Sequence, residues 1–280
     1  MTPYPRGVTV TVEQSVVGHR LLVPTGVATP QGEVVGVEIV GGQIERQVTA
    51  PGLGLGALVV RVETDELHIR NTLAPPTNHD YPQAAFQPRP NRYTTAAEPL
   101  AAAAKALAAA AGGGQAGIQA LALEAQSRFS YAHPEERFND GTDAVPYLAC
   151  GQTPGSCVDI NTYFVASLRA AGYQAAYLYG YFFPAESGGV THDMHCWVVT
   201  RWGDDLQAWD IAHYMKANLG AVGPILNPRP GQRVAMGHSM GHHYPALAID
   251  ELKLLAEPLW LNGSTCTRAL PLTIALETGP

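Results

Sequence analysis

Short stretches of the first seventy or so residues alternate between hydrophobic and polar positions. Successive side chains of a strand point to opposite faces, so a two-residue period is typical of strands with one buried face. This period predicts a small antiparallel β domain over residues 1–73. The alternating hydrophobic positions are Val8, Val10, Val12, Val35, Val37 and Ile39, and the rhythm continues over 58–62 and 67–69.

The pattern changes at residue 74, where prolines become frequent. Too many prolines fall within 74–99 for a regular helix or strand, so we expect an extended linker there. The alanine-rich run that follows favours a helix up to Ala111, ended by three glycines, and a second helix is expected over 118–128. We therefore place the linker at 74–99 and a larger domain at 100–280.

A helix with a cysteine at its start is predicted between Gly155 and Gly172. Ser156 can cap the helix, Gly172 marks its end, and hydrophobic residues recur within it at steps of three or four. Cys157 would then be the first helical residue. Unpaired N–H groups and the positive end of the helix dipole stabilise a thiolate there, and the thiolate is the reactive form of cysteine.

A β-hairpin is predicted downstream, with Gly203 and Asp204 as its two-residue turn. This register pairs Trp197 with Asp210 and places His195 on the same face, one diagonal step from Asp210. The carboxylate can then orient the imidazole beside a thiol nucleophile. A slip of one residue would turn Asp210 to the other face.

In the predicted helix and the predicted hairpin the chain resembles the transglutaminase-like superfamily, which carries Cys, His and Asp in this chain order. The resemblance covers roughly 96–210. Where the family often has Asp-Pro, this chain has Asp210-Ile211. The matching segments are Gly155-Ser156-Cys157-Val158-Asp159, Leu168 to Tyr173, Gly180-Tyr181, His195-Cys196-Trp197-Val198 and Trp209-Asp210.

The resemblance implies an α+β fold, with a papain-like transglutaminase core of helices packed on an antiparallel sheet, preceded here by the small β domain. It also implies acyl transfer or amide hydrolysis through a thioester on Cys157, with His195 as base and Asp210 as orienting residue. The substrate would be a peptide or protein amide, and hydrolysis is favoured over cross-linking. The alternative is a non-catalytic binding or scaffold protein in which these three residues have structural roles.

Four further residues are candidates for contact with a substrate. Gln152 lies in a loop five residues before Cys157, where its amide can stabilise an oxyanion, as a glutamine does in papain-like enzymes. His192, Trp197 and His238 could contact the substrate, although a loop histidine and a core tryptophan are the simpler interpretations.

Two other patterns suggest different chemistry. Residues 237–241 read Gly-His-Ser-Met-Gly, like the nucleophile elbow of serine hydrolases, but no histidine follows His243 to complete a triad. His238, His242 and His243 cluster without the spacing of a zinc site. We therefore expect no metal and no cofactor, and the role of the histidine cluster stays open.

The charge and the distribution of apolar residues bear on which partners the protein binds and where in the cell it is located. The formal net charge is −7 and no basic cluster is present, which disfavours nucleic acid and membrane partners. Residues 1–20 lack the apolar core of a signal peptide, and no apolar run could span a bilayer, so we expect a cytoplasmic protein. The four cysteines are expected to be free thiols. The oligomeric state does not follow from the sequence.

Overall fold

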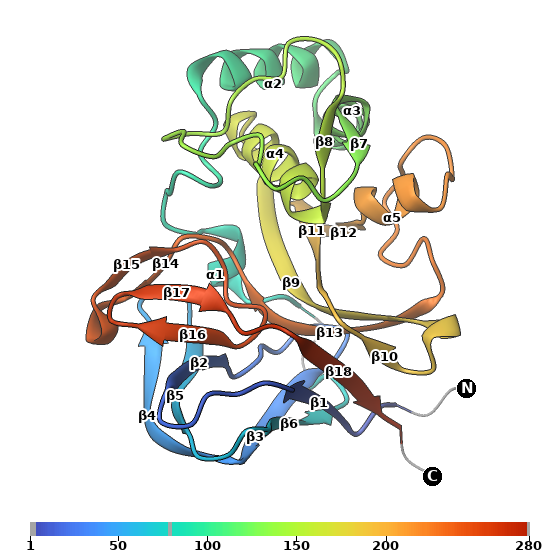
Figure 1. The fold of residues 1–280 in the computed structure, drawn as a ribbon. Coiled ribbons are helices and arrows are strands. Elements are labelled where there is room, and N and C mark those ends of the chain that lie inside the picture. The colour runs from blue at the N-terminus through green and yellow to red at the C-terminus, as the bar shows by residue number, and fades with distance from the viewer. Residues whose placement is uncertain (1–3, 78–79, 279–280) are drawn as a thin grey trace. The chain divides into compact units, whose positions relative to one another are not determined.

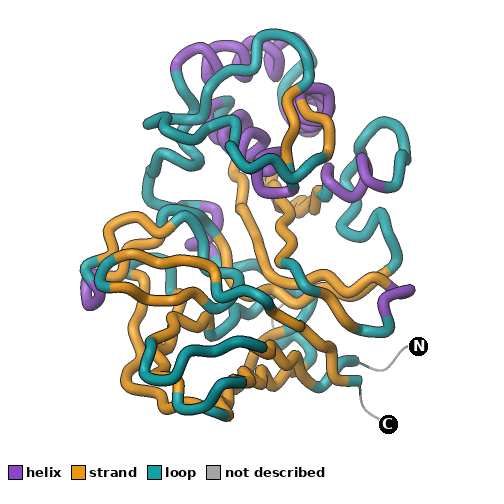
Figure 2. Tube along the Cα trace, in the orientation of Figure 1, coloured by secondary structure: helices purple, strands orange, loops and turns teal. Residues whose placement is uncertain are grey.

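The computed structural model describes residues 4–77 and 80–278 (Figure 1). These residues form two compact units. The first, which we call the β unit, takes the described residues of Met1–Ala84, Tyr179–Met194 and Gly231–Pro280. The second, the helical unit, consists of Ala85–Leu178 and His195–Pro230. Strands dominate the β unit and the longer helices belong to the helical unit (Figure 2).

The β unit begins with the strands that the alternating pattern predicts. Two five-stranded sheets have the orders β10-β18-β1-β6-β3 and β17-β16-β2-β5-β4, and β14 pairs with β15. The strands before the linker are β1 (Gly7–Val12), β2 (Arg20–Pro24), β3 (Glu33–Val40), β4 (Gly42–Ala50), β5 (Leu55–Val62) and β6 (Leu67–Ala74). Those after it are β10 (Val190–Thr191), β13 (Gly231–His238), β14 (His242–Tyr244), β15 (Ile249–Leu252), β16 (Leu259–Asn262), β17 (Thr265–Arg268) and β18 (Leu272–Glu277).

Both five-stranded sheets combine strands from the two ends of the chain. β1 pairs antiparallel with β18, with Gly7 opposite Glu277, and β2 pairs antiparallel with β16. The core of the second sheet likewise joins Leu22 and Val59 to Leu255 and Leu259. Residues far apart in sequence thus complete one hydrophobic core. The predicted domain boundaries after residues 73 and 99 stay a prediction about how the chain folds.

The predicted linker contains one short helix, α1 (Gln83–Phe86). The helical unit then contains α2 (Glu98–Ala110), α3 (Gly114–Arg128) and α4 (Cys157–Ala170), which lie side by side in Figure 1. α2 ends at the glycines, as predicted. α3 begins four residues earlier than predicted, because Gly113 adopts a φ of +70° and turns the chain directly into the next helix.

The strands of the helical unit are short or shared with the β unit. β7 (Phe129–Tyr131) and β8 (Thr153–Gly155) form a parallel pair. β11 (Met194–Trp202) has β12 (Asp205–Trp209) and β9 (Gln174–Pro184) as its neighbours, and α5 (Ile211–Lys216) follows β12. Two 3-10 turns, η1 (Ala185–Ser187) and η2 (Pro245–Leu247), belong to the β unit. Helices with mostly antiparallel sheets confirm the predicted α+β class.

Within the described residues, the structure contains no helix with the length and hydrophobicity needed to cross a membrane.

Candidate active site

The start of α4 holds the candidate nucleophile, as the sequence predicts. Cys157 is the first helical residue after the N-cap Ser156. Ser156 Oγ accepts a hydrogen bond from Val158 N at 3.3 Å, and Asp159 Oδ2 accepts one from Ser156 N at 2.8 Å. This reciprocal arrangement is a capping box, which satisfies N–H groups at the helix start and fixes the direction in which the chain enters the helix.

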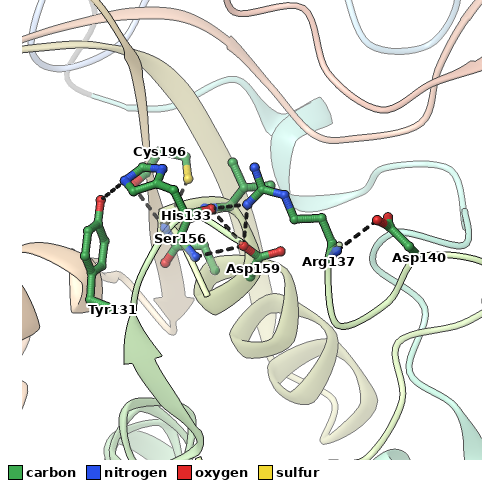
Figure 3. Close-up of polar contacts among 9 residues, drawn as sticks. Tyr131, His133, Arg137, Asp140, Ser156, Asp159 and Cys196 are labelled. Carbon is green, nitrogen blue, oxygen red and sulfur yellow. Dashed lines mark hydrogen bonds and ion pairs between the residues drawn. The ribbon is translucent and has the colours of Figure 1, made fainter. Parts of the chain in front are cut away.

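A second contact fixes the same helix start from a neighbouring loop. Figure 3 shows Arg137 pointing at Ser156 and Asp159. Its Nη1 lies 2.6 Å from Ser156 Oγ and 2.5 Å from Asp159 Oδ2, while its backbone N–H donates to Asp140 Oδ2 at 2.9 Å. Asp159 is buried, so Arg137 supplies the positive charge that a buried carboxylate requires. The loop and the helix start are thereby held together.

The residue before the cap must be glycine. A Cβ on Gly155 would lie 2.5 Å from the nearest ring atom of Phe129. Real Cβ atoms do not approach other heavy atoms so closely, so the strand leading to the cysteine packs against Phe129 only without a side chain. The position of Cys157 thus depends on close packing of β8 against β7.

The hairpin has the predicted register, which brings His195 and Asp210 together. Val198 lies opposite Trp209 and Trp202 opposite Asp205, with Gly203 and Asp204 as the turn. Asp210 follows β12 directly and caps α5. His195 Nε2 lies 2.9 Å from Asp210 Oδ2. A carboxylate can only accept, so His195 carries its proton on Nε2, and Nδ1 is the ring nitrogen left for the sulfur.

Cys157 and His195 form the other half of the site through a hydrogen bond between sulfur and imidazole. Cys157 is 5% exposed, His195 6% and Asp210 0%. The structure therefore brings the three predicted residues into one chain of hydrogen bonds within the helical unit. Their catalytic roles remain a prediction at this point.

The surroundings shift the pKa values of both reactive groups toward the charged pair. A hydrogen bond from Cys196 and then the hydrogen bond and charge of His195 hold the pKa of Cys157 well below its usual value, against the effect of burial. Burial alone would lower the pKa of His195, but the charge and hydrogen bond of Asp210, followed by those of Cys157, raise it. A thiolate beside an imidazolium is the state that these shifts favour.

Cys196 forms a hydrogen bond with the Cys157 sulfur, and Asn161 in turn contacts Cys196. Burial and the neighbouring Cys157 raise the pKa of Cys196, so it stays a thiol and donates while Cys157 carries the charge. Asn161 Nδ2 donates to the Cys196 carbonyl at 3.0 Å and lies 3.3 Å from its sulfur. Figure 3 shows Cys196 above the start of α4. The sequence analysis named Cys196 only as a member of a matching segment, since a buried cysteine has no distinctive spacing.

His213 is a functional candidate that the sequence analysis did not identify. Its Nδ1 lies 2.8 Å from Asp210 Oδ2, the same oxygen that His195 contacts. The two imidazole rings are stacked, with centroids 4.0 Å apart and planes 5° from parallel. The available signal was its place three residues after Asp210, which is N3 of a helix capped by that aspartate.

Among the described residues, His195, Asp210 and His213 are the cluster of potential metal ligands, with donor atoms within 4.8 Å of one another. An imidazole binds a metal through a lone pair in the plane of its ring. The two rings are stacked and nearly parallel, so an ion cannot lie in both planes at once. In this structure Asp210 Oδ2 instead has the two imidazoles as its partners, His195 Nε2 at hydrogen-bond distance and His213 Nδ1 at ion-pair distance.

The other predicted contact residues lie in different surroundings. Gln152 is exposed and lines an open groove of about 610 Å³ with Tyr131, Tyr214 and Lys216. Trp197 is fully buried in β11. The roles predicted for Gln152 and Trp197 stay predictions.

Two of the predicted histidines belong to the β unit. His192 is exposed, with Nδ1 3.0 Å from the Leu272 carbonyl oxygen. His238 ends β13, fully buried, with Nδ1 2.9 Å from Ser239 Oγ. Burial lowers the pKa of the neighbouring His242 to about 4. A substrate contact of His192 or His238 stays a prediction.

The serine of the Gly-His-Ser-Met-Gly pattern is completely buried. Ser239 has a φ of +65° and lies in the turn between the strands β13 and β14. A nucleophile elbow instead leads from a strand into a helix and exposes its serine. The surroundings of Ser239 are therefore not those of a serine nucleophile.

Comparison with known proteins bears on the family and the fold. Residues 101–209 match the sequence profile of the transglutaminase-like superfamily. No curated protein matches the chain. The fold is similar to that of a candidate cysteine protease from Cytophaga hutchinsonii, with a TM-score of 0.56 and 12% identity over 99% of both chains. The periplasmic domain of TgpA from Pseudomonas aeruginosa has a TM-score of 0.40 and 14% identity over 78% of this chain and 93% of that one.

The matched residues contain Cys157 and His195 and end one residue before Asp210. The structure from Cytophaga hutchinsonii adds a likeness of fold alone, because only 12% of its sequence is identical. Residues 101–209 of this chain are therefore similar in sequence to the transglutaminase-like superfamily.

Proposed function

We propose that the protein is an enzyme that cleaves or transfers an acyl group through a thioester on Cys157. The observation that carries this proposal is the continuous hydrogen-bond chain from Cys157 through His195 to the fully buried Asp210. Structural cysteines and histidines seldom combine a lowered thiol pKa with a carboxylate-bound imidazole.

The reaction begins from the thiolate and the imidazolium. The sulfur of Cys157 attacks the amide carbonyl carbon, and the carbonyl oxygen becomes an oxyanion. The imidazolium of His195 then gives its proton to the leaving nitrogen, the carbon–nitrogen bond breaks, and an amine and a thioester are formed. Asp210 stays ionised throughout and keeps the ring in the orientation that the transfer requires.

The second half of the reaction restores the free enzyme. The now neutral His195 takes a proton from water or from an amine, and the oxygen or nitrogen attacks the thioester carbon. The carbon–sulfur bond breaks and Cys157 leaves as a thiolate. Water gives hydrolysis, and an amine gives transfer. Hydrolysis of a peptide or protein amide is the reaction that we favour.

The start of α4 is suited to stabilise the oxyanion. The backbone N–H of Cys157 is at the first position of the helix, where no carbonyl within the helix can accept its hydrogen bond. Gln152 lies in the loop that leads into β8, and its exposed amide is available as a second donor. We propose a cytoplasmic location for the enzyme, as expected from the sequence.

Selective alkylation tests the nucleophile without knowledge of the substrate. Iodoacetamide at mildly acidic pH should label Cys157 faster than the exposed Cys150, because the lowered pKa keeps Cys157 partly ionised. Equal rates for the two cysteines would favour a scaffold protein and contradict the proposal.

A chemical acyl donor tests the thioester. p-Nitrophenyl acetate should leave an acetyl group on wild-type protein, seen as a mass increase that the peptide digest assigns to Cys157. The variant Cys157→Ala should lose this mass increase, while Cys150→Ala and Ser239→Ala should keep it, since one is an exposed thiol and the other a buried hydroxyl. An acetyl group that persists in Cys157→Ala would reject Cys157 as the nucleophile.

A further inference from the structure

We propose that His213 is a positioning residue of this site, which fixes both the Asp210 carboxylate and the plane of the His195 ring. The inference rests on the proposed function of Cys157 and His195 and assigns a fourth residue to it. His213 is 3% exposed and lies on α5, one turn after Asp210.

The first part of the argument is the set of donors around the carboxylate. Asp210 Oδ1 accepts the backbone N–H of His213 at 3.0 Å, which is the ordinary N-cap bond. Oδ2 lies 2.8 Å from His213 Nδ1 and 2.9 Å from His195 Nε2. The helix is capped by the backbone bond alone, so the imidazole of His213 is not needed for capping. What the side chain adds is a second donor on the oxygen that orients His195.

The second part is the stacking of the two rings. The His213 ring covers one face of His195 at a centroid distance of 4.0 Å and nearly parallel. His195 has to keep Nε2 toward Asp210 for Nδ1 to face Cys157. A ring packed flat against its face opposes rotation about the Cβ–Cγ bond and excludes water from the hydrogen bond to Asp210. His213 thus restricts the two movements that would break the chain of hydrogen bonds.

The third part concerns charge. When His213 is neutral, its ring nitrogen shares the negative charge of Asp210 with His195. When His213 is protonated, it places a second positive charge beside the His195 imidazolium. Either way, His213 limits how strongly Asp210 raises the pKa of His195. Removing the N–H while keeping the ring should therefore raise the pKa of His195 further.

Other ionisable groups lie on the elements that pack against α5. α4 contributes Cys157, Asp159, Tyr163 and Arg169, β7 contributes Tyr131, and α5 itself carries Tyr214. α3 contributes Glu124 and Arg128, which form an ion pair at 2.7 Å with each other. α5 itself also carries Lys216, whose Nζ lies 5.0 Å from the centre of the Tyr131 ring. None of these is among the groups that shift the pKa of His195 most, apart from Cys157.

Two substitutions separate the donor from the stack. His213→Phe keeps a flat ring against His195 but removes the N–H that Asp210 Oδ2 accepts. His213→Asn keeps an N–H donor near the position of Nδ1 but removes most of the ring. His243→Asn is the matched control, since His243 is a partly exposed histidine of the β unit.

The readout is the rate of Cys157 alkylation and of p-nitrophenyl acetate turnover as a function of pH. For His213→Phe we expect the alkaline limb of the turnover profile to move up by about half to one pH unit, as the loss of one charge-sharing hydrogen bond predicts. For His213→Asn we expect a maximal rate about tenfold lower, with limbs close to those of wild type, because orientation is lost and the donor is kept. A purely structural residue would change the yield of folded protein but neither the limbs nor the maximal rate of the folded fraction.

Failure of this inference differs from failure of the proposed function. A wild-type protein without a fast-reacting Cys157 would reject the proposed function itself. The role of His213 alone would be overturned if wild-type protein is reactive and both folded His213 variants match it. The match would have to hold for the limbs of the pH profile and for the maximal rate. If neither variant folds, nitrogen NMR of ¹⁵N-histidine wild-type protein decides. The expected result is His213 protonated on Nδ1 with a downfield proton that Asp210→Asn removes, and a His213 ring protonated only on Nε2 would overturn the inference.

Discussion

Replacing Asp210 by asparagine should remove most of the activity while leaving the fold in place. Asparagine has the same shape as aspartate and is an equally good N-cap, so its oxygen can still accept the backbone N–H of His213. Its amide nitrogen then occupies the place of Oδ2, to which His195 Nε2 now donates and which lies 2.8 Å from His213 Nδ1. Donor would face donor at less than 3 Å, so both rings must change their protonation.

The change in protonation determines the size of the effect. To accept from the asparagine amide, His195 has to lose the proton on Nε2 and carry it on Nδ1, which faces the sulfur. A ring protonated on that nitrogen cannot take the proton of Cys157, and the charge that raised the pKa of the imidazole is gone. A base held in the wrong tautomer costs roughly 10³- to 10⁴-fold in turnover. The pKa of Cys157 should rise at the same time, because it loses the support of an imidazolium.

Two measurements test this expectation. Turnover of p-nitrophenyl acetate gives the rate, and alkylation of Cys157 at mildly acidic pH gives the loss of thiolate. Asp250→Asn is the matched control, since the Asp250 side chain is 95% exposed in the β unit. An Asp210→Asn protein that is folded and turns over within about threefold of wild type would refute the orienting role of Asp210.

Three further predictions follow from the same contacts. Cys196→Ala should raise the pKa of Cys157 and slow its alkylation at mildly acidic pH but not at alkaline pH, because the hydrogen bond from Cys196 lowers that pKa most. The pH profile of turnover should rise as Cys157 ionises, at a pH below the usual thiol pKa of 9.0, and fall as His195 loses its proton, at a pH above 6.5, since the two pKa values shift in opposite directions. Arg137→Ala should lower the free energy of unfolding in urea by roughly 1–3 kcal/mol, because Asp159 is left as a buried carboxylate without its cation; an unchanged midpoint would show that water replaces Arg137.

The sequence predicted those parts of the site that depend on local rules. Cys157 could be placed at a helix start because Ser156 is a good cap and Gly172, with a φ of +88°, ends the helix. The contact of His195 with Asp210 could be predicted because a two-residue turn fixes the register of a hairpin. Both inferences need only residues close together in the chain.

Contacts that depend on distant residues could not be predicted in this way. The pairing of β1 with β18 joins Gly7 to Glu277, and short strands such as β16 and β17 have no pattern that names their partners. The same limit hid the contact of Cys196 with Cys157, which depends on how α4 packs against β11.

For His213 the sequence gives the position in the helix but not the direction of the side chain. The sequence places it three residues after Asp210, but there its side chain could point to the carboxylate, to solvent or into the core. Only the packing of α5 decides among these, and it turns the ring onto His195. A histidine at N3 of a helix capped by an aspartate that contacts the candidate base is therefore a pattern worth testing in other sequences. Where the hairpin places a histidine beside that aspartate, the same two-ring arrangement on one carboxylate oxygen is geometrically accessible.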